Sequence, residues 1–388
     1  MQYRKNPKNG DELSILGFGC MRFPKDAKET ERLILYAIDH GVNYFDTAYM
    51  YRGSEAALGE ALHRHDKRGE VFIATKIVPM MIRKTGDFEK YFRQQLDRLQ
   101  TDYIDYYMMH MLTDAKTWRR MLDLGIEAWI AEKKAEGKIR NLGFSYHGGR
   151  EEFFALCDAW QWDFCLIQYN YLDEFNQAGK DGLRYAAGKG MPVMVMEPLR
   201  GGLLASSLPK GVKAAFERAP VDRSPAEWSF RWLWDQPEVT CVLSGMEGME
   251  VLRANIEVAS SAEAGAFTES DFAVIAQAKA AFSEAIKVPC TGCGYCMPCP
   301  QGVDIPTCLS CYNNIVIEGK GSAIRRYLMQ TSMKAKPQAA SLCSKCGACE
   351  PRCPQGIAIR DALAHTATAL EPFYFKPAVA VARWIQKL

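Results

Sequence analysis

The chain has 388 residues, of which 48% are hydrophobic and 24% are charged. This length allows one large domain or two to three ordinary ones, and the average composition argues against a disordered or fibrous protein. Its 48 Lys and Arg residues against 46 Asp and Glu residues give a formal charge of +2, so charge gives no reason to expect a nucleic-acid partner.

Cysteine is the exceptional residue type, because ten of the 14 cysteines lie between Cys290 and Cys353. Clustered cysteines in a long chain indicate metal ligands in a reducing compartment rather than a disulfide scaffold. The first residues lack the apolar stretch of a secretion signal, and no run of about 18 apolar residues could span a membrane. We therefore expect a cytoplasmic protein without a transmembrane segment.

Eight short apolar runs recur through the first part of the chain, at 15–21, 43–47, 71–76, 104–110, 140–145, 165–170, 192–197 and 239–245. Their continuous hydrophobicity is typical of strands buried on both faces. Helical patterns separate them, at 27–40, at 55–62 after Ser54 as N-cap, at 118–136, from Ser224-Pro225, and from Thr268 to about Lys287. Eight βα units in series predict an α/β fold, a closed (β/α)8 TIM barrel, with an open doubly wound sheet as the alternative.

Active sites of such barrels lie at the carboxyl ends of the strands, so polar residues there are candidates. Asp46, Lys76 and His110 end the second, third and fourth runs, and Tyr51 follows the second. A carboxylate can hold a lysine charged, an ammonium can lower the pKa of a phenol, and a neutral histidine can orient a carbonyl. Each residue alone is more often structural, in an ion pair or in the core. Together they predict proton delivery to a carbonyl that receives a hydride.

The segments that hold these residues resemble the aldo-keto reductase family, at 43–51, 74–76, 105–110, 141–145 and 167–170. The resemblance covers residues from about 10 to 285. It implies NAD or NADP as cofactor and the reduction of a small-molecule carbonyl or the oxidation of an alcohol. By this resemblance Tyr51 is the general acid, Lys76 tunes its pKa, Asp46 is the partner of Lys76, and His110 orients the substrate.

The resemblance also implies a set of cofactor contacts. These are Gly19 and Met21 after the first strand, Ser145 and Gln168 at the nicotinamide carboxamide, Met196 at the nicotinamide ring, Pro198, Leu199, Arg200 and Gly201 toward the pyrophosphate, and Ser244, Gly245, Met246 and Asn255 toward the adenine. Met196 stands where the family usually has an aromatic shelf for the nicotinamide. Glu247 and Glu250 would repel a 2′-phosphate, unless they form only a solvated helix face, so NAD and NADP both stay open.

Two cysteine runs follow the barrel. Cys343, Cys346, Cys349 and Cys353, followed by Pro354, have the C-x₂-C-x₂-C-x₃-C-P spacing of bacterial 4Fe–4S ferredoxins. The earlier run, Cys290, Cys293, Cys296 and Cys299, is one residue shorter before its last cysteine. Chain crossing then suggests two clusters, one held by Cys290, Cys293, Cys296 and Cys353, the other by Cys343, Cys346, Cys349 and Cys299. A zinc ribbon is the alternative, and Cys308 and Cys311 could be spare or could replace a ligand.

This part of the chain resembles two-cluster ferredoxin domains. The sequence thus predicts a barrel over residues 1–288, a small α-rich ferredoxin-like iron–sulfur domain over 289–370 with helices at 312–318 and 322–333, and a tail or docking helix over 371–388.

Nicotinamide transfers a hydride, whereas each 4Fe–4S cluster transfers one electron, and no flavin-binding signature joins the two. Three hypotheses follow. The barrel reduces a carbonyl while the clusters serve the structure or an external ferredoxin or flavoprotein, or the clusters deliver single electrons to a barrel-bound substrate, or the barrel senses cofactor redox state and the clusters report it to a partner. The tetrad favours the first, and the sequence does not identify the substrate.

Overall fold

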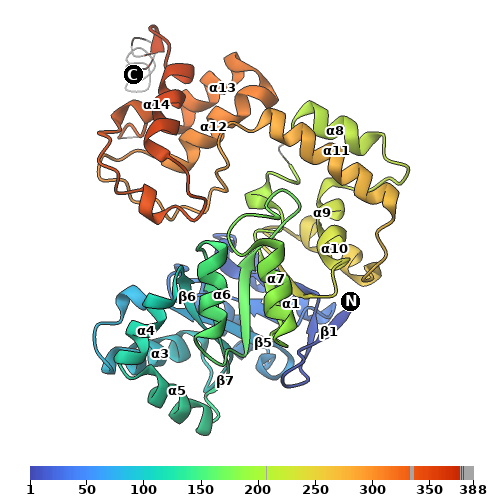
Figure 1. Ribbon diagram of the computed structural model, residues 1–388, viewed down its shortest axis with the longest axis vertical. Coiled ribbons are helices and arrows are strands. Elements are labelled where there is room, and N and C mark those ends of the chain that lie inside the picture. The colour runs from blue at the N-terminus through green and yellow to red at the C-terminus, as the bar shows by residue number, and fades with distance from the viewer. Residues whose placement is uncertain (207, 333–335, 376, 378, 380–388) are drawn as a thin grey trace. The chain divides into compact units, whose positions relative to one another are not determined.

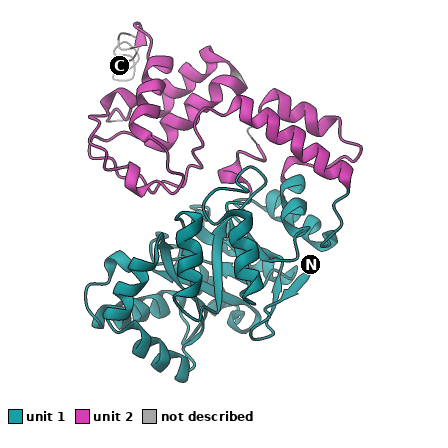
Figure 2. Ribbon diagram, in the orientation of Figure 1, with its two compact units in different colours: residues 1–198, 227–268 teal, residues 199–226, 269–388 magenta. Residues whose placement is uncertain are grey.

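The computed structural model describes residues 1–206, 208–332, 336–375, 377 and 379. The chain forms two compact units, one of residues 1–198 and 227–268 and the other of residues 199–226 and 269–388 (Figure 2). The expected domain boundary at residue 288 lies inside the second unit. It does so because helix α11 (Glu269–Ala285) packs against α8 (Lys210–Glu217), and both belong to that unit.

The first unit is built on a closed barrel of parallel strands in the order β10-β3-β4-β5-β6-β7-β8-β9 (Figure 1). The strands are β3 (Leu16–Gly19), β4 (Tyr44–Asp46), β5 (Phe72–Ile77), β6 (Ile104–Leu112), β7 (Ile139–Tyr146), β8 (Phe164–Gln168), β9 (Val193–Met196) and β10 (Val239–Ser244). All eight expected strands are present. The prediction of a TIM barrel is therefore confirmed, and the alternative of an open doubly wound sheet is wrong.

Helices alternate with the strands. They are α1 (Ala27–Asp39), α2 (Ser54–Arg64), α3 (Gly86–Leu99), α4 (Ala115–Asp123), α5 (Ile126–Ala135), α6 (Arg150–Asp158), α7 (Gly179–Gly188), α9 (Pro225–Trp234) and α10 (Met249–Ser261). Two expectations are wrong. The helix expected at 118–136 is broken into α4 and α5, because Gly125 takes a left-handed φ of 84° between them. Gly53, not Ser54, is the N-cap of α2, and the Ser54 hydroxyl instead donates to the carbonyl oxygen of Cys20 at 2.8 Å.

A short antiparallel hairpin, β1 (Tyr3–Lys5) with β2 (Glu12–Ser14), precedes the barrel and was not expected. Leu13 of β2 is fully buried in the cluster of apolar side chains that fills the barrel, together with Tyr44, Tyr106 and Phe164. Because β2 leads directly into the start of β3, this hairpin lies at the amino end of the barrel. The carboxyl end is left for the site.

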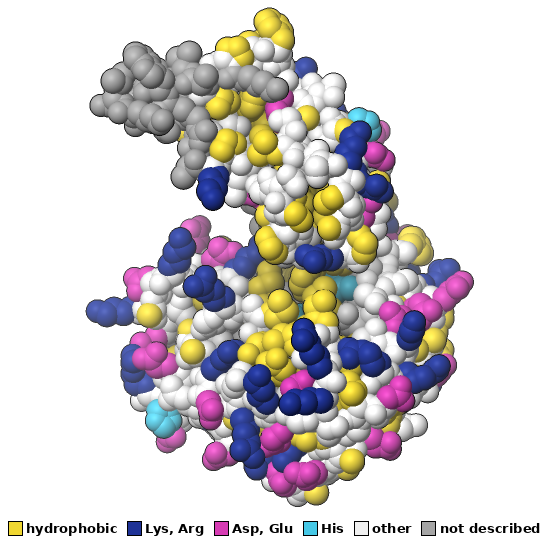
Figure 3. All heavy atoms as spheres, turned by 90° about the vertical axis from the view of Figure 1, so that its left-hand side faces the viewer, with side chains coloured by type: hydrophobic (Ala, Val, Ile, Leu, Met, Phe, Trp, Pro, Cys, Tyr) yellow, Lys and Arg dark blue, Asp and Glu magenta, His cyan; other side chains and the backbone are white. Residues whose placement is uncertain are grey.

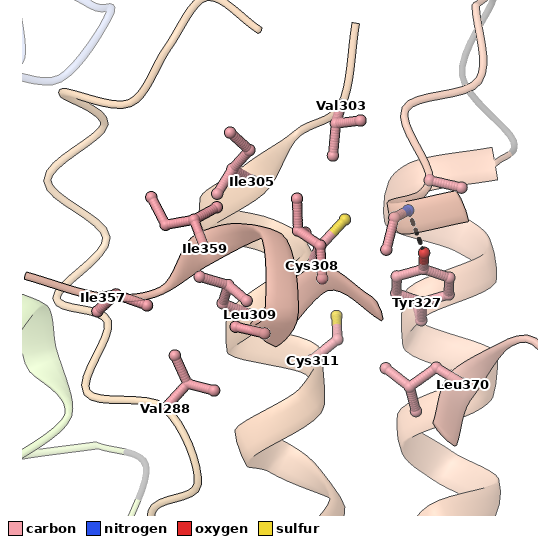
Figure 4. Packing of buried hydrophobic residues seen from close by; sticks show 14 of the residues in the cluster. Val288, Val303, Ile305, Cys308, Leu309, Cys311, Tyr327, Ile357, Ile359 and Leu370 are labelled. Atoms are coloured by element: carbon pink, nitrogen blue, oxygen red, sulfur yellow. Dashed lines mark hydrogen bonds between the residues drawn. The ribbon is translucent and has the colours of Figure 1, made fainter. Parts of the chain in front are cut away.

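The second unit is helical and contains α8 and α11 as well as α12 (Ile305–Glu318), α13 (Lys320–Tyr327) and α14 (Ile359–Leu370), with a π-helical turn at Leu328–Ser332. Its apolar core includes Val303, Leu309 and Tyr327 (Figure 4). Helix α12 includes the helix expected at 312–318 and begins at Ile305, where Asp304 caps it by accepting a hydrogen bond from the backbone N–H of Thr307 at 3.3 Å.

The start of the expected C-terminal tail packs on the second unit. The Tyr327 hydroxyl donates to Glu371 at 2.5 Å, and the buried ring of Phe375 lies 5.6 Å from the Tyr327 ring. Most of the expected docking helix beyond Phe375 lies outside the described residues. Among the described residues, no helix is long and apolar enough to cross a membrane.

Gly59 marks a close approach between α2 and α3, because a β-carbon there would lie 2.5 Å from the backbone oxygen of Arg98. We expect Gly59→Ala to lower the free energy of unfolding by roughly 1–3 kcal/mol, since backbone atoms cannot give way as a flexible side chain can. The midpoint of urea unfolding measures this. Gly69→Ala is the control, because a β-carbon on Gly69 meets no atom within 4 Å. Equal midpoints for the two variants would contradict the close packing.

Candidate active site and cysteine pockets

A buried ion pair lies at the carboxyl end of the barrel. Asp46 ends β4 and Lys76 lies on the neighbouring strand β5, and the Lys76 Nζ donates to Asp46 Oδ1 at 2.5 Å and to the Thr47 carbonyl oxygen at 2.8 Å. The Lys76 side chain is only 1% exposed and the Asp46 side chain only 5%. Burial raises the pKa of Asp46, and the Lys76 ammonium opposes this rise. The two charges therefore act as one neutral unit in a site of low dielectric.

Tyr51 and His110 flank this pair. The Lys76 Nζ lies 5.0 Å from the centroid of the Tyr51 ring, and the Tyr51 and His110 rings meet edge to face with centroids 5.8 Å apart. Tyr51 is held on the turn between β4 and α2 by its N–H bond to Ala48 at 2.9 Å, and His110 lies on β6. The structure thus brings all four residues of the expected tetrad together.

The pKa of Tyr51 differs from the expectation drawn from its lysine neighbour. Burial, and after it the Asp46 carboxylate, raises the pKa of the phenol well above its ordinary value, with smaller effects in the same direction from Cys20 and Glu197. Burial and the Asp46 carboxylate together outweigh any lowering of this pKa by the Lys76 ammonium. Tyr51 therefore stays protonated at neutral pH, as a proton donor must be.

Two histidines at the site are neutral. Burial, followed by the charge of Lys76, lowers the pKa of His110 well below its ordinary value. His147, directly after β7, is also buried, and burial lowers its pKa to about 4. Its Nδ1–H donates to Gln177 Oε1 at 3.2 Å. The sequence analysis missed His147, although the rule that polar residues at strand ends are candidates would have found it.

Cys20 is the second residue that the sequence analysis missed. It follows β3, it is fully buried, and its thiol donates to the carbonyl oxygen of Phe18 at 3.4 Å. Burial, followed by the charge of Asp46, raises the pKa of the Cys20 thiol well above its ordinary value. A neutral thiol therefore lies beside the tetrad. No spacing in the sequence linked this cysteine to the others.

Ser145 and Gln168, the expected carboxamide contacts, lie on the neighbouring strands β7 and β8. The Ser145 hydroxyl accepts a hydrogen bond from the backbone N–H of Met111 at 2.8 Å. Gln168 Nε2 donates to Asp173 at 3.0 Å, and its Oε1 accepts from Gln177. These bonds fix the orientation of the Gln168 amide. Met196, at the end of β9, is partly exposed, and Pro198 is buried.

The residues expected toward the adenine are mostly interior. Ser244, Met246 and Asn255 are buried, and Asn255 Nδ2 donates to Ser244 Oγ at 3.2 Å. Gly245 and Met21 are exposed. A β-carbon on Gly19 would lie 3.4 Å from the Ser244 backbone, in ordinary van der Waals contact, so the ends of β3 and β10 lie side by side.

The loop expected at the pyrophosphate falls in the second unit from Leu199 onward. Arg200 and Gly201 have left-handed φ values of 48° and 66°, and the Gly202 N–H donates to the Leu199 carbonyl oxygen at 2.9 Å. Arg200–Gly202 therefore forms a tight turn of the second unit.

Two pockets of the second unit are bordered by the clustered cysteines. One, of about 310 Å³, is lined by Cys290, Cys293, Cys296 and Cys353. The other, of about 480 Å³, is lined by Cys299, Cys343, Cys346 and Cys349, and Cys296 also reaches it. Each run therefore sends its last cysteine to the pocket of the other run, as chain crossing requires. Among the described residues, no three Cys, His, Asp or Glu side chains converge on the position of a single metal ion.

The thiols that affect the pKa of Cys296 and of Cys349 fall into the same two sets as the thiols that line the pockets. Burial raises the pKa of Cys296 to about 12, with further contributions from Cys290, Cys293 and Cys353. Burial likewise raises the pKa of Cys349, and its contributing thiols are Cys343 and Cys299. The two sets of thiols are thus the same by lining and by electrostatics.

The loops around the pockets have the chemistry of an iron–sulfur site. Gly292, Gly294 and Gly347 have left-handed φ values of 71°, 79° and 77°, which let the chain turn tightly between cysteines. The backbone N–H of Lys345 donates to Cys343 Sγ at 3.4 Å, and such N–H groups stabilise clusters. Four thiols and an N–H donor around a pocket fit a cubane cluster.

Cys308 and Cys311 line neither pocket. Both are fully buried on α12, with their sulfur atoms in the apolar core near Tyr327 (Figure 4). The Cys308 thiol donates to the Gln338 carbonyl oxygen at 3.6 Å, and the Cys311 thiol donates to Gln330 Oε1 at 3.4 Å. Both cysteines are packed as core residues.

Two family models match successive parts of the chain. The model of the Aldo/keto reductase family matches residues 15–280, and that of a 4Fe-4S dicluster domain matches residues 289–358. The chain is 27% identical over 294 residues to the uncharacterized oxidoreductase YqkF of Bacillus subtilis, covering 67% of this chain and 92% of YqkF. It is 26% identical over 322 residues to protein tas of Escherichia coli, covering 66% of this chain and 92% of tas.

A solved structure shows the same relationship. The holo form of aldo-keto reductase AKR11C1 from Bacillus halodurans superposes with a TM-score of 0.61 at 27% sequence identity, covering 72% of this chain and 96% of AKR11C1.

The neutral histidines make stability depend on pH. His147 binds a proton only near pH 4 when folded, against an ordinary value of 6.5, so between these values the unfolded chain binds more protons and stability falls as the pH falls. We expect a slope of up to about 1.4 kcal/mol per pH unit from such a group. Urea unfolding of His147→Asn should show a flatter dependence on pH than the parent protein. The exposed His63→Asn is the control, and a His147→Asn slope equal to that of the parent would contradict the neutral state.

Proposed function

Because the chain belongs to the aldo/keto reductase family and carries a 4Fe-4S dicluster domain, we propose that it reduces a small-molecule carbonyl with NAD(P)H, or oxidises the alcohol in reverse. One observation carries the proposal. The protonated Tyr51 phenol, the buried Lys76–Asp46 pair and the neutral His110 lie together at the carboxyl end of the barrel.

The chain's own residues supply the proton and the positioning. The bound nicotinamide supplies a hydride to the carbonyl carbon. Tyr51 donates its hydroxyl proton to the carbonyl oxygen as negative charge develops there, and His110 orients that oxygen with a hydrogen bond. The Lys76 ammonium, 5.0 Å from the centroid of the Tyr51 ring, stabilises the phenolate that remains, and Asp46 holds the ammonium in place. Hydride and proton together convert C=O to CH–OH.

Ser145 and Gln168 hold the nicotinamide carboxamide in this proposal, and NAD is the preferred dinucleotide. Glu247 and Glu250 are exposed at the start of α10, where two carboxylates would repel a phosphate monoester. Arg253, the one cation of residues 244–255, has its guanidinium carbon 5.3 Å from the centroid of the Tyr36 ring. Arg253 thus already makes a cation–π contact with Tyr36.

In the second unit we propose two 4Fe–4S clusters with crossed ligands. Cys290, Cys293, Cys296 and Cys353 hold one, and Cys299, Cys343, Cys346 and Cys349 hold the other. The lining of the two pockets supports these sets. Such clusters supply one-electron transfer when bound. Cys296 lines both pockets, so the two clusters are neighbours.

The proton donor is tested with Tyr51→Phe. We expect kcat/KM for carbonyl reduction to fall by roughly 10²–10⁴-fold, because the phenyl ring keeps its packing but carries no proton. Tyr3→Phe, at an exposed tyrosine of the hairpin, is the control. Assays run in parallel with NADH and NADPH test the dinucleotide. Full activity of Tyr51→Phe would refute the general acid, and a clear preference for NADPH would refute the choice of NAD.

The crossed ligands are tested by iron content and by electron paramagnetic resonance of the reduced protein. Cys353→Ala and Cys299→Ala should each lose roughly half of the iron, with different signals remaining. Adding Cys290→Ala to Cys353→Ala should remove little more iron, whereas adding Cys343→Ala should remove nearly all of it. Cys308→Ala should keep the full content. Loss of iron from Cys308→Ala equal to that from Cys299→Ala would overturn the ligand sets.

A further inference from the structure

The loops after β3, β4 and β5 lie side by side at the carboxyl end of the barrel, because these strands are neighbours in the sheet. Each loop carries an exposed methionine followed within three residues by an exposed arginine, Met21 with Arg22, Met50 with Arg52 and Met80 with Arg83. We call Arg22, Arg52 and Arg83 the arginine rim. Tyr51 stands between Met50 and Arg52, so the rim borders the proton donor.

The arginine rim has no acidic partner within the described part of the chain, where none of its three guanidinium groups forms an ion pair. The nearest carboxylates in the sequence bond to other groups instead, Glu55 to the Arg98 guanidinium at 3.0 Å and the other two to backbone N–H groups. Asp26 accepts from the Lys28 backbone N–H at 2.9 Å, and Asp87 accepts from the backbone N–H groups of Arg83 and Lys84 at 2.9 and 3.1 Å. The charges of the arginine rim are therefore available to a ligand.

Some cations on the helices of the same unit form ion pairs. Arg64 pairs with Glu60, Arg93 with Glu89, Arg150 with Asp181 and Lys189 with Asp158. Figure 3 shows cationic and acidic side chains mixed over one face of the barrel unit. Several exposed cations on those helices, such as Lys28 and Arg119, also form no ion pair among the described residues, so what sets the arginine rim apart is its place on three neighbouring loops.

Three other loops of the barrel rim, those after β8, β9 and β10, are acidic. The loop residues of the first unit after β8, β9 and β10 are 169–178, 197–198 and 245–248. They hold Asp173, Glu174, Glu197 and Glu247 and no Lys or Arg. Gln168 and the adenine contacts are expected on this side of the rim. Of these two sets of first-unit loops, the set after β3, β4 and β5 is the one that offers favourable charge to an anionic group.

The loops of the arginine rim are held in place. The Ser54 hydroxyl, two residues after Arg52, donates to the Cys20 carbonyl oxygen at 2.8 Å, which ties the first loop to the second. The Arg120 guanidinium donates to the carbonyl oxygens of Pro79 and Ile82 at 2.7 and 2.9 Å, which pins the third loop. Loops held in this way lose little backbone entropy when a ligand binds.

We propose that the arginine rim binds the anionic group of the substrate while Met21, Met50 and Met80 contact its apolar body. The substrate class is then a carbonyl compound with an apolar body and a carboxylate or phosphate distant from the carbonyl. Guanidinium groups bind both anions through paired N–H donors. The three methionines are 42%, 56% and 77% exposed, and their flexible thioethers suit an apolar ligand surface. This inference rests on the proposed carbonyl reduction at Tyr51.

The test compares three aldehydes on the full-length protein with its clusters. They are 4-carboxybenzaldehyde, 4-formylphenyl phosphate and the neutral methyl 4-formylbenzoate. We expect kcat/KM for at least one anionic probe to exceed that for the neutral probe by at least tenfold. This ratio should fall at least fivefold in Arg52→Gln and in Arg22→Gln or Arg83→Gln, and it should fall with added salt. The two anionic arms show whether carboxylate or phosphate is preferred.

Arg93→Gln, on the outer face of α3, is the matched control and should keep the ratio of the parent protein. Binding of the same probes to Tyr51→Phe, measured by calorimetry, separates the anion site from the chemistry. If an anionic probe binds more tightly than the neutral probe and this preference is lost in Arg52→Gln, the arginine rim is supported. If in addition no aldehyde is reduced, only the proposed reaction is refuted. Turnover of all three probes with equal kcat/KM would overturn the rim and leave the reaction standing. If the protein shows no binding preference for the anionic probes and reduces none of the three aldehydes, both the arginine rim and the proposed reaction are overturned.

Discussion

The buried ion pair between Lys76 and Asp46 is the constraint on which the carboxyl end of the barrel depends. Removing two charges from water costs several kcal/mol for each ion, and their attraction offsets this only with good geometry and added hydrogen bonds. Lys76 has both, since it also donates to the Thr47 carbonyl oxygen at 2.8 Å. Among the described residues, however, Asp46 Oδ2 has no hydrogen-bond partner. A pair that leaves a buried oxygen unsatisfied is poorly explained by stability and better explained by what it does to Tyr51.

A network of buried hydrogen bonds between β5 and the helices α2 and α3 holds the backbone of Lys76 in place. Gln95 of α3 donates to the Lys76 carbonyl oxygen at 3.1 Å and to Glu55 of α2 at 2.8 Å, and Thr75 donates to the same Glu55 carboxylate at 2.6 Å. Arg98 completes the network with a 3.0 Å bond to Glu55. Because the network joins β5 to both adjoining helices, the strand cannot shift without breaking several buried hydrogen bonds. The position of the ammonium near Tyr51 is thereby fixed by the helices that follow β4 and β5.

The sequence was informative wherever periodicity or spacing determines position. Strand ends follow from apolar runs, and a parallel barrel brings all strand ends to one rim, so Asp46, Lys76 and His110 could be grouped without coordinates. Properties that depend on three-dimensional surroundings could not be read in this way. Gly125 breaks a helical pattern only because the chain there turns left-handed. The pKa of Tyr51 rises rather than falls because burial and the Asp46 counter-charge outweigh its lysine neighbour, and neither burial nor neutralisation has a signature in the chain.

Of the two kinds of redox chemistry proposed for this chain, carbonyl reduction does not depend on the other. A hydride and the Tyr51 proton account for both electrons and the proton that a carbonyl takes up, so carbonyl reduction balances without any one-electron carrier. The iron–sulfur unit therefore adds to the chemistry of the barrel and does not complete it. A protein that only sensed a dinucleotide, or only relayed single electrons, would have no need to keep a protonated phenol beside a buried ion pair. Retention of that costly arrangement is the strongest argument that proton transfer at the barrel is the chemistry this fold is built to perform.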